Sequence, residues 1–186
     1  MQDDKALIQA CIKGDRAAQK ALYDRYCGKM MLICLRYARS TQEAEDALQE
    51  SFIKVFASLN QFRFESRFDT WMTRIAINTA LNQQRQKLYL LPMVTVEDAN
   101  LTEDEEINLS QFRLKELVEM IQTLPDGCRI VFNLFAIEGY GHKEIADMLE
   151  ISVGTSKSQY NRARTLLQKK LNLQEKKVRK YGEASV

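Results

Sequence analysis

The sequence predicts an all-α protein of two small helical domains joined by a flexible linker. Only two prolines and seven glycines occur among 186 residues, which permits long helices and disfavours an all-β design. Apolar residues recur at helical spacing along most of the chain, and strand-like alternation is nearly absent. Residues 90–107 break this pattern, with Pro92 near their start and acids crowding their end. We interpret them as a tether between domains, with an ordered surface loop within one domain as the alternative.

The first domain, residues 1–89, is expected to hold five helices. Gly14 and Asp15 end the first helix, and Ser40 begins the fourth as an N-cap, with Glu43 reaching back to complete a capping box. A loop at 59–67 separates the fourth helix from the fifth. The expected helices span residues 4–13, 16–27, 29–39, 41–58 and 68–87.

The second domain, residues 108–172, is expected to end in a helix-turn-helix. Two helices precede that motif, one over about 110–123 and one over about 125–137 that begins with a proline suited to a first helical turn. A basic tail, residues 173–186, follows the motif. The sequence shows no internal repeat that would suggest a different organisation.

The helix-turn-helix is predicted from apolar spacing and from a cap. Ile145, Ala146 and Leu149 share one face of a short helix. Residues 150–152 form the turn, and the hydroxyl of Ser152 suits the N-cap of the next helix, because it can accept from a free backbone N–H. We expect Val153 to continue the apolar stripe of the motif.

Charge is unevenly distributed, although the net charge is only +2. Residues 151–180 hold nine Lys or Arg against the single acid Glu175, whereas residues 96–106 hold six acids and no base. A basic block of this kind suits nucleic acid. Residues 176–180 taken alone are more typical of a solvated tail.

Several classes of function are disfavoured by composition. The four cysteines form no CxxC pair and there is one histidine, so we expect no metal site and no cofactor. No nucleophile paired with a base and no phosphate-binding glycine loop is evident, so we expect no enzymatic activity. The polar N-terminus and the lack of a long apolar run predict neither a signal peptide nor a membrane span. A cytoplasmic protein with reduced thiols is therefore expected.

The second helix of the motif has the composition of a DNA-recognition helix. A helix that enters the major groove needs short polar groups near its N-terminus for base edges and longer cations for phosphates. The alternative is a solvated amphipathic helix, which the combination of turn, cap and polarity makes less favourable. The candidate DNA-binding residues are Thr155, Lys157, Ser158, Asn161, Arg162 and Arg164.

The segment 60–71 interleaves aromatic residues with cations. Aromatic faces stack on unpaired bases, at about 1–3 kcal/mol per base, while cations hold the backbone of a single strand. We expect Phe64, Ser66 and Arg67 to contact nucleic acid. Phe62 and Trp71 are better interpreted as core anchors.

The helix after this segment presents Arg74, Asn78 and Asn82 one turn apart. The amides of Asn78 and Asn82 are able to contact base edges, although solvated asparagines are an equal alternative. The preceding helix presents a mixed face that would suit a large protein surface, or that is simply solvated. The residues of that face are Asp46, Gln49, Glu50 and Lys54, beside Phe52 and Val55.

Three blocks of sequence carry a family resemblance. They are AEDALQESF at 44–52, FRFESRFDTWMTRIAIN at 62–78 and ISVGTSKS at 151–158. In this order, with an acidic tether before the last, they resemble the extracytoplasmic-function group of bacterial sigma factors over nearly the whole chain. The first two blocks are similar to sigma region 2, and the third is similar to region 4.

The resemblance implies a promoter-specificity subunit that binds core RNA polymerase and promoter DNA and is commonly held by an anti-sigma factor. The family's region 2 helix docks on the largest polymerase subunit, a role that carries onto Asp46, Gln49, Glu50 and Phe52. The next loop and helix melt and hold the −10 element, a role that carries onto Phe64, Glu65, Ser66, Phe68, Asn78 and Asn82, to which we add Arg67 and Arg74. Region 4 recognises the −35 element, and Thr155, Lys157, Ser158, Asn161 and Arg162 match its recognition helix, to which we add Arg164.

The chain departs from the family pattern at four positions. Phe64 stands where a glycine is frequent, and Gly141 where a serine or threonine cap is frequent. Ser156 replaces a usual apolar residue, and Gln159 replaces a usual arginine.

Two other functions compete with the sigma factor. A stand-alone helix-turn-helix regulator would bind DNA tightly without polymerase, usually as a dimer on a symmetric site, but it leaves the aromatic and basic loop unexplained. A protein that sequesters a partner through its helical faces would show no base preference, and it leaves the recognition helix unexplained.

Overall fold

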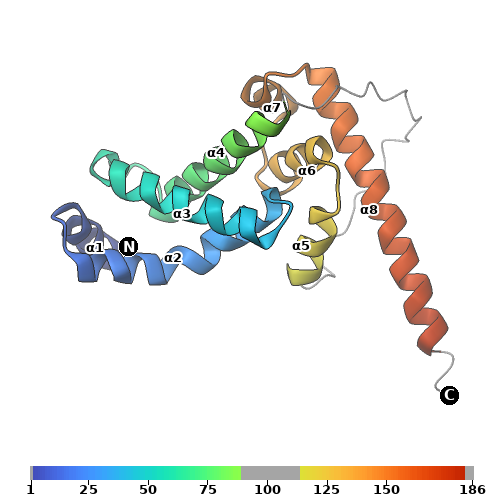
Figure 1. Ribbon diagram of the computed structural model, residues 1–186. Helices are drawn as coiled ribbons and strands as arrows, with labels where there is room; N and C mark the ends of the chain where they lie inside the picture. Colours follow the sequence, from blue (N-terminus) through green and yellow to red (C-terminus); the bar gives the residue numbers. More distant parts are fainter. Residues whose placement is uncertain (1, 89–113, 183–186) are drawn as a thin grey trace. The chain divides into compact units, whose positions relative to one another are not determined.

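The structure, a computed structural model, describes residues 2–88 and 114–182 (Figure 1). Every regular element in these two ranges is a helix, which confirms the all-α prediction. The chain divides into two compact units, Met1–Leu90 (unit 1) and Leu91–Val186 (unit 2). The predicted linker, 90–107, and the start of the predicted second domain lie outside the described residues.

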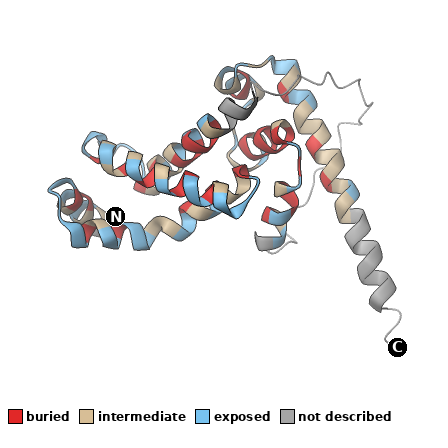
Figure 2. Cartoon of the chain, in the orientation of Figure 1, coloured by how far each residue is buried: buried red, intermediate tan, exposed pale blue. Residues whose placement is uncertain are grey.

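Unit 1 is a small helical bundle. Its elements are α1 (Gln2–Ile12), α2 (Arg16–Tyr37), α3 (Thr41–Ser58), the 3₁₀ turn η1 (Leu59–Gln61) and α4 (Phe68–Leu88). Helices α2, α3 and α4 pack on one another, and α1 packs on α2 and reaches η1. Buried residues line the inner faces of these helices (Figure 2). The core they form includes Leu22, Ile33, Tyr37, Ala44, Val55, Met72, Ala76 and Ile77.

Side-chain caps define where two of these helices begin. Asp15 Oδ1 accepts hydrogen bonds from the backbone N–H of Ala17 at 2.8 Å and Ala18 at 3.1 Å, and so starts α2. Ser40 Oγ accepts from the N–H of Glu43 at 3.2 Å, as predicted for the start of α3. The carboxylate of Glu43 accepts from the N–H of Arg39 at 3.0 Å, one residue before the cap. The reciprocal half of the predicted capping box is therefore shifted by one position.

The two helices predicted over 16–27 and 29–39 are wrong, because α2 runs without interruption through Gly28. A glycine inside a helix costs about 1 kcal/mol relative to alanine. Buried residues on both sides of it, including Leu22 and Met30, hold the two halves against the same core. Their packing outweighs the local preference of one exposed glycine.

Unit 2 contains α5 (Leu114–Gln122), α6 (Asp126–Phe132), the π-helical segment η3 (Asn133–Ile137), α7 (His142–Leu149) and α8 (Val153–Gly182). Helix α8 packs on α5, α6 and α7. The residues buried together at this junction are Met120, Ile121, Leu124, Cys128, Phe132, Ala163 and Leu167.

The helix predicted over 125–137 does end at Ile137, but its second half, Asn133–Ile137, is π-helical. After Phe132 the backbone hydrogen bonds become π-helical. The N–H of Glu138, for example, donates to the carbonyl of Asn133 at 3.0 Å, five residues back. The buried amide of Asn133 also donates to the carbonyl of Arg129 at 3.0 Å. A side chain that bonds to a carbonyl of the helix ladder is a known cause of such irregularity.

A buried ion pair fixes the entry to α6. Arg129 Nη2 lies 2.6 Å from Asp126 Oδ1, and both side chains are less than one-tenth exposed. Arg129 also donates to the carbonyl of Leu124 at 3.1 Å. The guanidinium therefore ties the turn between α5 and α6 to the body of α6.

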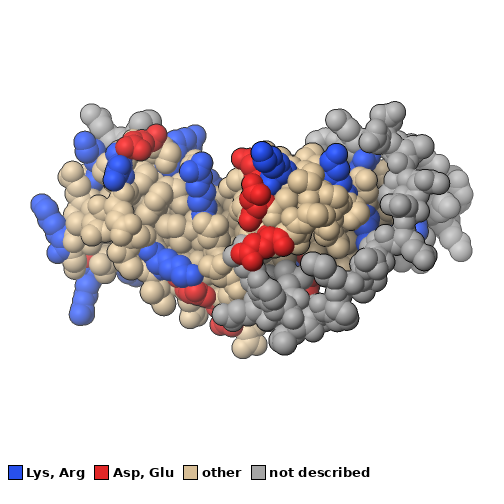
Figure 3. Space-filling model, turned by 90° about the horizontal axis from the view of Figure 1, so that it is seen from above, with Lys and Arg blue, Asp and Glu red and all other residues tan. Residues whose placement is uncertain are grey.

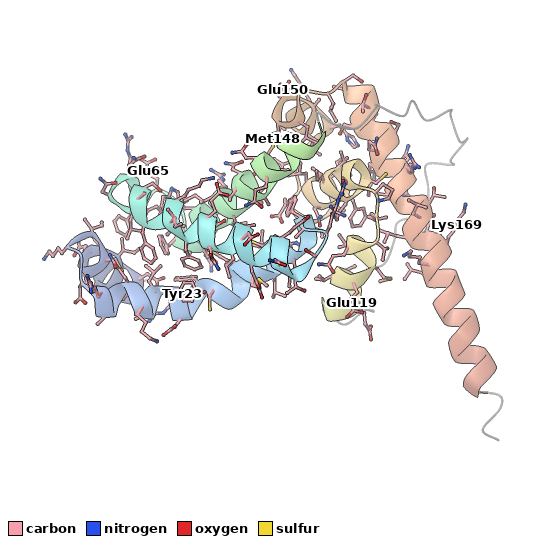
Figure 4. All side chains as sticks on the ribbon, viewed as in Figure 1. Tyr23, Glu65, Glu119, Met148, Glu150 and Lys169 are labelled. Carbon is pink, nitrogen blue, oxygen red and sulfur yellow. The ribbon has the colours of Figure 1, made fainter. Side chains whose placement is uncertain are left out.

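Helix α8 extends beyond the predicted end of the second domain at residue 172. It continues to Gly182, so the segment predicted as a basic tail from residue 173 extends the helix. Lys169 projects outward from α8 (Figure 4). None of the helices within the described ranges combines the length and the low charge that crossing a lipid bilayer requires.

Candidate nucleic-acid interface

A tight turn joins α7 to α8 and forms the predicted helix-turn-helix. The carboxylate of Glu144 accepts from the N–H of Gly141 at 2.8 Å, and this bond starts α7. At the other end Glu150 adopts a left-handed backbone, with φ 57° and ψ 40°. This conformation ends α7 and lets the N–H of Ile151 donate to the carbonyl of Ala146 at 3.1 Å. The turn thereby directs α8 away from α7.

The first turn of α8 is held by hydroxyls. Ser152 Oγ accepts from the N–H of Thr155 at 2.9 Å, which confirms the predicted N-cap. The same oxygen lies 2.9 Å from Thr155 Oγ1. Val153, which we expected in the apolar stripe, is instead 42% exposed, because it occupies the first turn on the outer side of the helix.

The outer face of α8 displays the candidate recognition residues. Lys157 and Ser158 are exposed, and Asn161 lies one turn beyond Lys157 and is half-buried. Arg164 is also half-buried, and its guanidinium lies 6.0 Å from the centroid of the Tyr160 ring. Cations and amides thus line one side of a helix whose other side is core, as a major-groove helix requires. Thr155 and Arg162 are half-buried beside them.

The inner face of α8 contains two polar bonds at the positions that depart from the family pattern. Ser156 is fully buried, and its hydroxyl lies 2.9 Å from His142 Nδ1. The imidazole of His142 stacks on Phe135, with 4.3 Å between ring centroids. Burial, with a smaller effect of the Lys157 charge, lowers the pKa of His142 below its ordinary value. The histidine that composition left without a role is therefore a packing residue of the motif.

Gln159 likewise faces inward. Its Oε1 accepts from the thiol of Cys128 at 3.0 Å, and its amide lies 3.3–3.4 Å from where a Cβ at Gly127 would be, closer than ordinary van der Waals contact. Burial raises the pKa of the Cys128 thiol, which favours its neutral, hydrogen-bond-donating form. Gln159 is thus removed from the DNA-facing side, where a longer cation would otherwise be expected.

In unit 1 the loop at 62–67 displays one aromatic ring above a buried aromatic cluster. Phe62 is 7% exposed, and its ring centroid lies 4.7 Å from Phe64, 5.2 Å from Phe68 and 5.3 Å from Trp71. Phe64 is 44% exposed and has a backbone φ of 60°, a left-handed conformation that bulky residues rarely adopt. The loop backbone is therefore strained at the residue whose ring it presents to solvent.

Charged groups on both sides of this loop are partly neutralised. Arg67 Nη2 lies 3.0 Å from Asp69 Oδ2, and Lys29 Nζ lies 2.9 Å from the same oxygen. The hydrogen bond from Lys29, followed by the charges of the two cations, lowers the pKa of Asp69. Arg67 is mostly exposed despite this pairing, and Ser66 and Glu65 are exposed, with Glu65 at the outer edge of unit 1 (Figure 4).

The exposed face of α4 continues from the loop. Arg74, Asn78 and Asn82 are all exposed and lie at successive turns of the helix. Trp71, predicted as a core anchor, is only half-buried and shares this face with Asn78 by its spacing of seven residues. Its position was missed because a tryptophan beside a loop is ordinarily buried.

The exposed face of α3 combines acids and an apolar side chain. Asp46 and Gln49 are exposed, and the half-buried Glu50 lies 2.6 Å from Lys54 Nζ and accepts from Gln83 Nε2 at 2.9 Å. The hydrogen bonds from Lys54 and then Gln83 lower the pKa of Glu50.

Ile53 on the same face is 68% exposed and was not among the predicted site residues. Its spacing from Gln49 and Glu50 would have identified it, because residues three and four apart share a helix face. An exposed isoleucine beside acids is a typical composition for a protein-docking surface.

Two predicted contact residues are corrected by their burial. Phe52 is 4% exposed and its ring lies 4.6 Å from that of Tyr23, so it is a core residue of α3 and not a surface contact. Phe68 is 5% exposed within the aromatic cluster, so it supports the loop without being open to DNA. Both were predicted from sequence motifs, which do not distinguish a contact from the residue that positions it.

Comparisons with known proteins identify both units. The family Sigma-70 region 2 matches residues 22–88, and the family Sigma-70, region 4 matches residues 114–167. The RNA polymerase sigma-H factor of Pseudomonas aeruginosa is 34% identical over 182 residues, covering 91% of this chain and 94% of that protein. The ECF RNA polymerase sigma-E factors of Haemophilus influenzae and Escherichia coli K12 are 32% and 31% identical, each covering 90% of this chain.

Among solved structures, the sigma factor RpoE in complex with the anti-sigma factor NepR from Bartonella quintana aligns with a TM-score of 0.48 and 20% identity. That alignment covers 82% of this chain and 96% of the other.

Proposed function

The chain belongs to the extracytoplasmic-function group of sigma-70 family RNA polymerase sigma factors, and on this premise we propose which of its surfaces performs each step of promoter recognition. A sigma factor directs core RNA polymerase to promoter DNA. It therefore needs a surface for polymerase, a surface for the duplex and a surface for the strand that melting exposes. The described residues offer one candidate for each.

We assign capture of the −10 element to the loop at 62–67 and the exposed face of α4. Phe64 supplies the ring on which an unpaired base stacks, at about 1–3 kcal/mol per base. Arg74, Asn78 and Asn82 supply polar groups along the path of the strand. Unpairing a base costs a few kcal/mol, so stacking on Phe64 and contacts to α4 offset the cost of melting.

Phe62 and Phe68 lie beneath this surface, and the half-buried Trp71 borders it. Their rings form the platform that holds Phe64 in place. Glu65, Ser66 and Arg67 complete the exposed rim of the loop. Arg67 forms an ion pair with Asp69, and this pair must break before Arg67 binds a phosphate. We therefore assign Arg67 a smaller contribution than Arg74 to binding of the −10 strand.

Recognition of the −35 element is assigned to the outer face of α8. Lys157 and Ser158 are exposed near the N-terminal end of the helix, where a recognition helix contacts base edges. Asn161, Arg162 and Arg164 lie further along and suit the flanking phosphates. Thr155 acts mainly through the cap that it shares with Ser152.

Docking on core polymerase is assigned to the face of α3 formed by Asp46, Gln49, Glu50 and Ile53. The acids favour a basic partner surface, and the exposed isoleucine provides apolar area that a partner would bury. Phe52 supports this face from the core.

One observation carries the proposal more than the others: the ring of Phe64, a residue with a strained backbone, is the exposed member of an otherwise largely buried aromatic cluster. A stand-alone regulator has no use for such a ring, because duplex DNA offers no unpaired base to stack on it. The matched relatives named above are all sigma factors, so the alternative regulator is not favoured.

The first experiment combines the purified chain with core bacterial RNA polymerase and maps the 5′ ends of RNA made from the host genome. We expect discrete start sites that share two upstream motifs. Binding to the non-template strand of the −10 motif is then compared with and without core polymerase. DNA binding without polymerase, together with no discrete start sites, would refute the assignment.

The docking surface is tested by Ile53→Glu, with Ile12→Glu as the matched control. Ile12 is also an exposed isoleucine, 47% exposed at the end of α1 and away from α3. Burying a new charge at the centre of an interface costs more than about 1 kcal/mol, so Ile53→Glu should weaken core polymerase binding at least fivefold. Ile12→Glu should leave it unchanged. Equal effects of the two substitutions would remove Ile53 from the interface.

Three further assignments rest on family membership. The chain acts without catalysing a reaction of its own, since polymerase performs the chemistry. It acts in the cytoplasm, where polymerase meets promoter DNA. An anti-sigma protein holds it when its promoters are silent, and such a partner would be recovered with the chain from uninduced cells and lost on induction.

A further inference from the structure

Helix α1 brings a cation to the loop that captures the −10 strand. The matched region 2 begins at residue 22, so α1 lies outside it. Lys5 Nζ on this helix lies 5.6 Å from the centroid of the Phe64 ring, over its face. Lys and Arg side chains project around this end of unit 1, at the left of Figure 3.

The position of α1 is fixed by several contacts. Asp4, next to Lys5, accepts from Arg25 Nη1 of α2 at 2.8 Å and is also hydrogen-bonded to Tyr26. Ile8 and Cys11 are buried, which anchors the same helix on the bundle. Lys5 therefore projects from a held helix and not from a loose terminus.

We propose that Lys5 is a further contact to the captured single strand, a role that rests on the proposed function of Phe64. Before DNA arrives, the ammonium covers the ring face that a base would use. When a base stacks there, the ammonium leaves the ring and binds the phosphate of the same or the adjacent nucleotide.

Replacing the Lys5 ammonium by a base on the Phe64 ring is favourable both for the ring and for the ammonium. A base stacked on an aromatic ring is held more strongly than an ammonium at an exposed ring. The displaced ammonium gains a phosphate, and the counterions that neutralised that phosphate are released. Lys5 also shields the ring in the free protein, where an uncovered aromatic surface would attract apolar contacts.

Lys5 differs in this respect from Arg67, a cation of the loop itself. Arg67 is paired with Asp69, so moving it to a phosphate breaks an ion pair between opposite charges. Moving Lys5 breaks only a cation–ring contact. Of the two, Lys5 is therefore the more available cation for the strand.

The test uses the full chain bound to core polymerase and a labelled oligonucleotide with the −10 non-template sequence. Dissociation constants are measured from low to high salt for wild type, Lys5→Met and Lys5→Arg. Lys13→Met is the matched control, because Lys13 is an exposed lysine that follows the other end of α1. Circular dichroism checks that each variant is folded.

We expect Lys5→Met to weaken binding and to reduce the slope of log affinity against log salt by about 0.7, the value for one phosphate of a single strand. Over a fourfold rise in salt, the dissociation constant of Lys5→Met divided by that of wild type should then shrink about 2.6-fold. Lys5→Arg should keep the wild-type slope, and so should Lys13→Met.

Lys5→Met that binds with wild-type affinity and slope would overturn the proposal. Weaker binding with an unchanged slope would also overturn it, because that result indicates a structural effect without a phosphate contact. Failure of the underlying function is seen separately: wild type would then not bind the oligonucleotide, or Phe64→Ala would bind it as well as wild type.

Discussion

Replacing Phe64 by glycine and by alanine separates the strain of its backbone from the use of its ring. Both substitutions remove the ring and its contact with Phe62, but glycine alone also removes the Cβ. A left-handed conformation costs a residue with a Cβ roughly 1–2 kcal/mol. Phe64 adopts that conformation, with φ at 60°.

The expected order of stability follows from two opposing terms. At an ordinary position glycine is less stable than alanine by about 0.4–1 kcal/mol, because its unfolded chain has more freedom. At Phe64 the relief of strain exceeds that loss. Phe64→Gly should therefore be more stable than Phe64→Ala by about 1 kcal/mol, the difference between the two terms.

Urea unfolding followed by Trp71 fluorescence reports on unit 1, which contains residue 64, and therefore measures the stability difference between the two variants. Trp71 is the single tryptophan of the chain and belongs to the ring cluster of the loop. Ala21→Gly, at an exposed position inside α2, is the control and should cost about 0.5–1 kcal/mol. Phe64→Ala that equals or exceeds Phe64→Gly in stability would refute the argument from strain.

The same pair of variants tests the ring. Both should lose about 1–3 kcal/mol of binding to the −10 strand, roughly a 5- to 150-fold change, regardless of their difference in stability. A glycine variant that binds the strand like wild type would show that the ring is not used for stacking.

Three further outcomes are expected. Lys157→Ala should weaken binding to −35 duplex by about 1–3 kcal/mol and relax preference at one base pair, whereas a uniform loss across sequences in competition assays would place Lys157 on a phosphate. Arg129→Met should cost about 3–5 kcal/mol of unit 2 stability by breaking the buried ion pair with Asp126, and a thermal shift near zero would contradict this. His142 has a lowered pKa, so its contribution to stability is complete above its unfolded value of 6.5 and falls as pH drops toward the folded value. His142→Phe should therefore lose less stability than wild type between pH 7.5 and 5.5, as measured by urea midpoints, and equal losses would reject this linkage.

Local signals predicted the fold where one capping or spacing rule acted alone. The start of α3 at Ser40 and the start of α8 at Ser152 follow from hydroxyls that accept backbone hydrogens. Gly28 was misjudged because packing on both sides of it outweighs its own preference. The π-helical segment after Phe132 depends on a buried amide bond of Asn133, which no periodicity of apolar residues indicates.

Local spacing also predicted much of the candidate site, but it did not predict which residues of a motif are buried. The exposed residues of α4 and α8 follow from helical spacing. Phe52 lies in the predicted motif but faces the core, and Ile53 beside it is exposed. A motif records which residues belong together, while burial decides which of them a partner is able to touch.

The polar bonds beneath α8 have a consequence for protein engineers who exchange recognition helices to create orthogonal promoters. A grafted helix with an apolar side chain in place of Ser156 would remove the hydrogen-bond partner of His142. A longer residue in place of Gln159 would press on Gly127 and leave the Cys128 thiol unmatched. A successful graft must therefore transfer each of these inner positions together with its neighbour on α6 or α7, as a set of compatible parts.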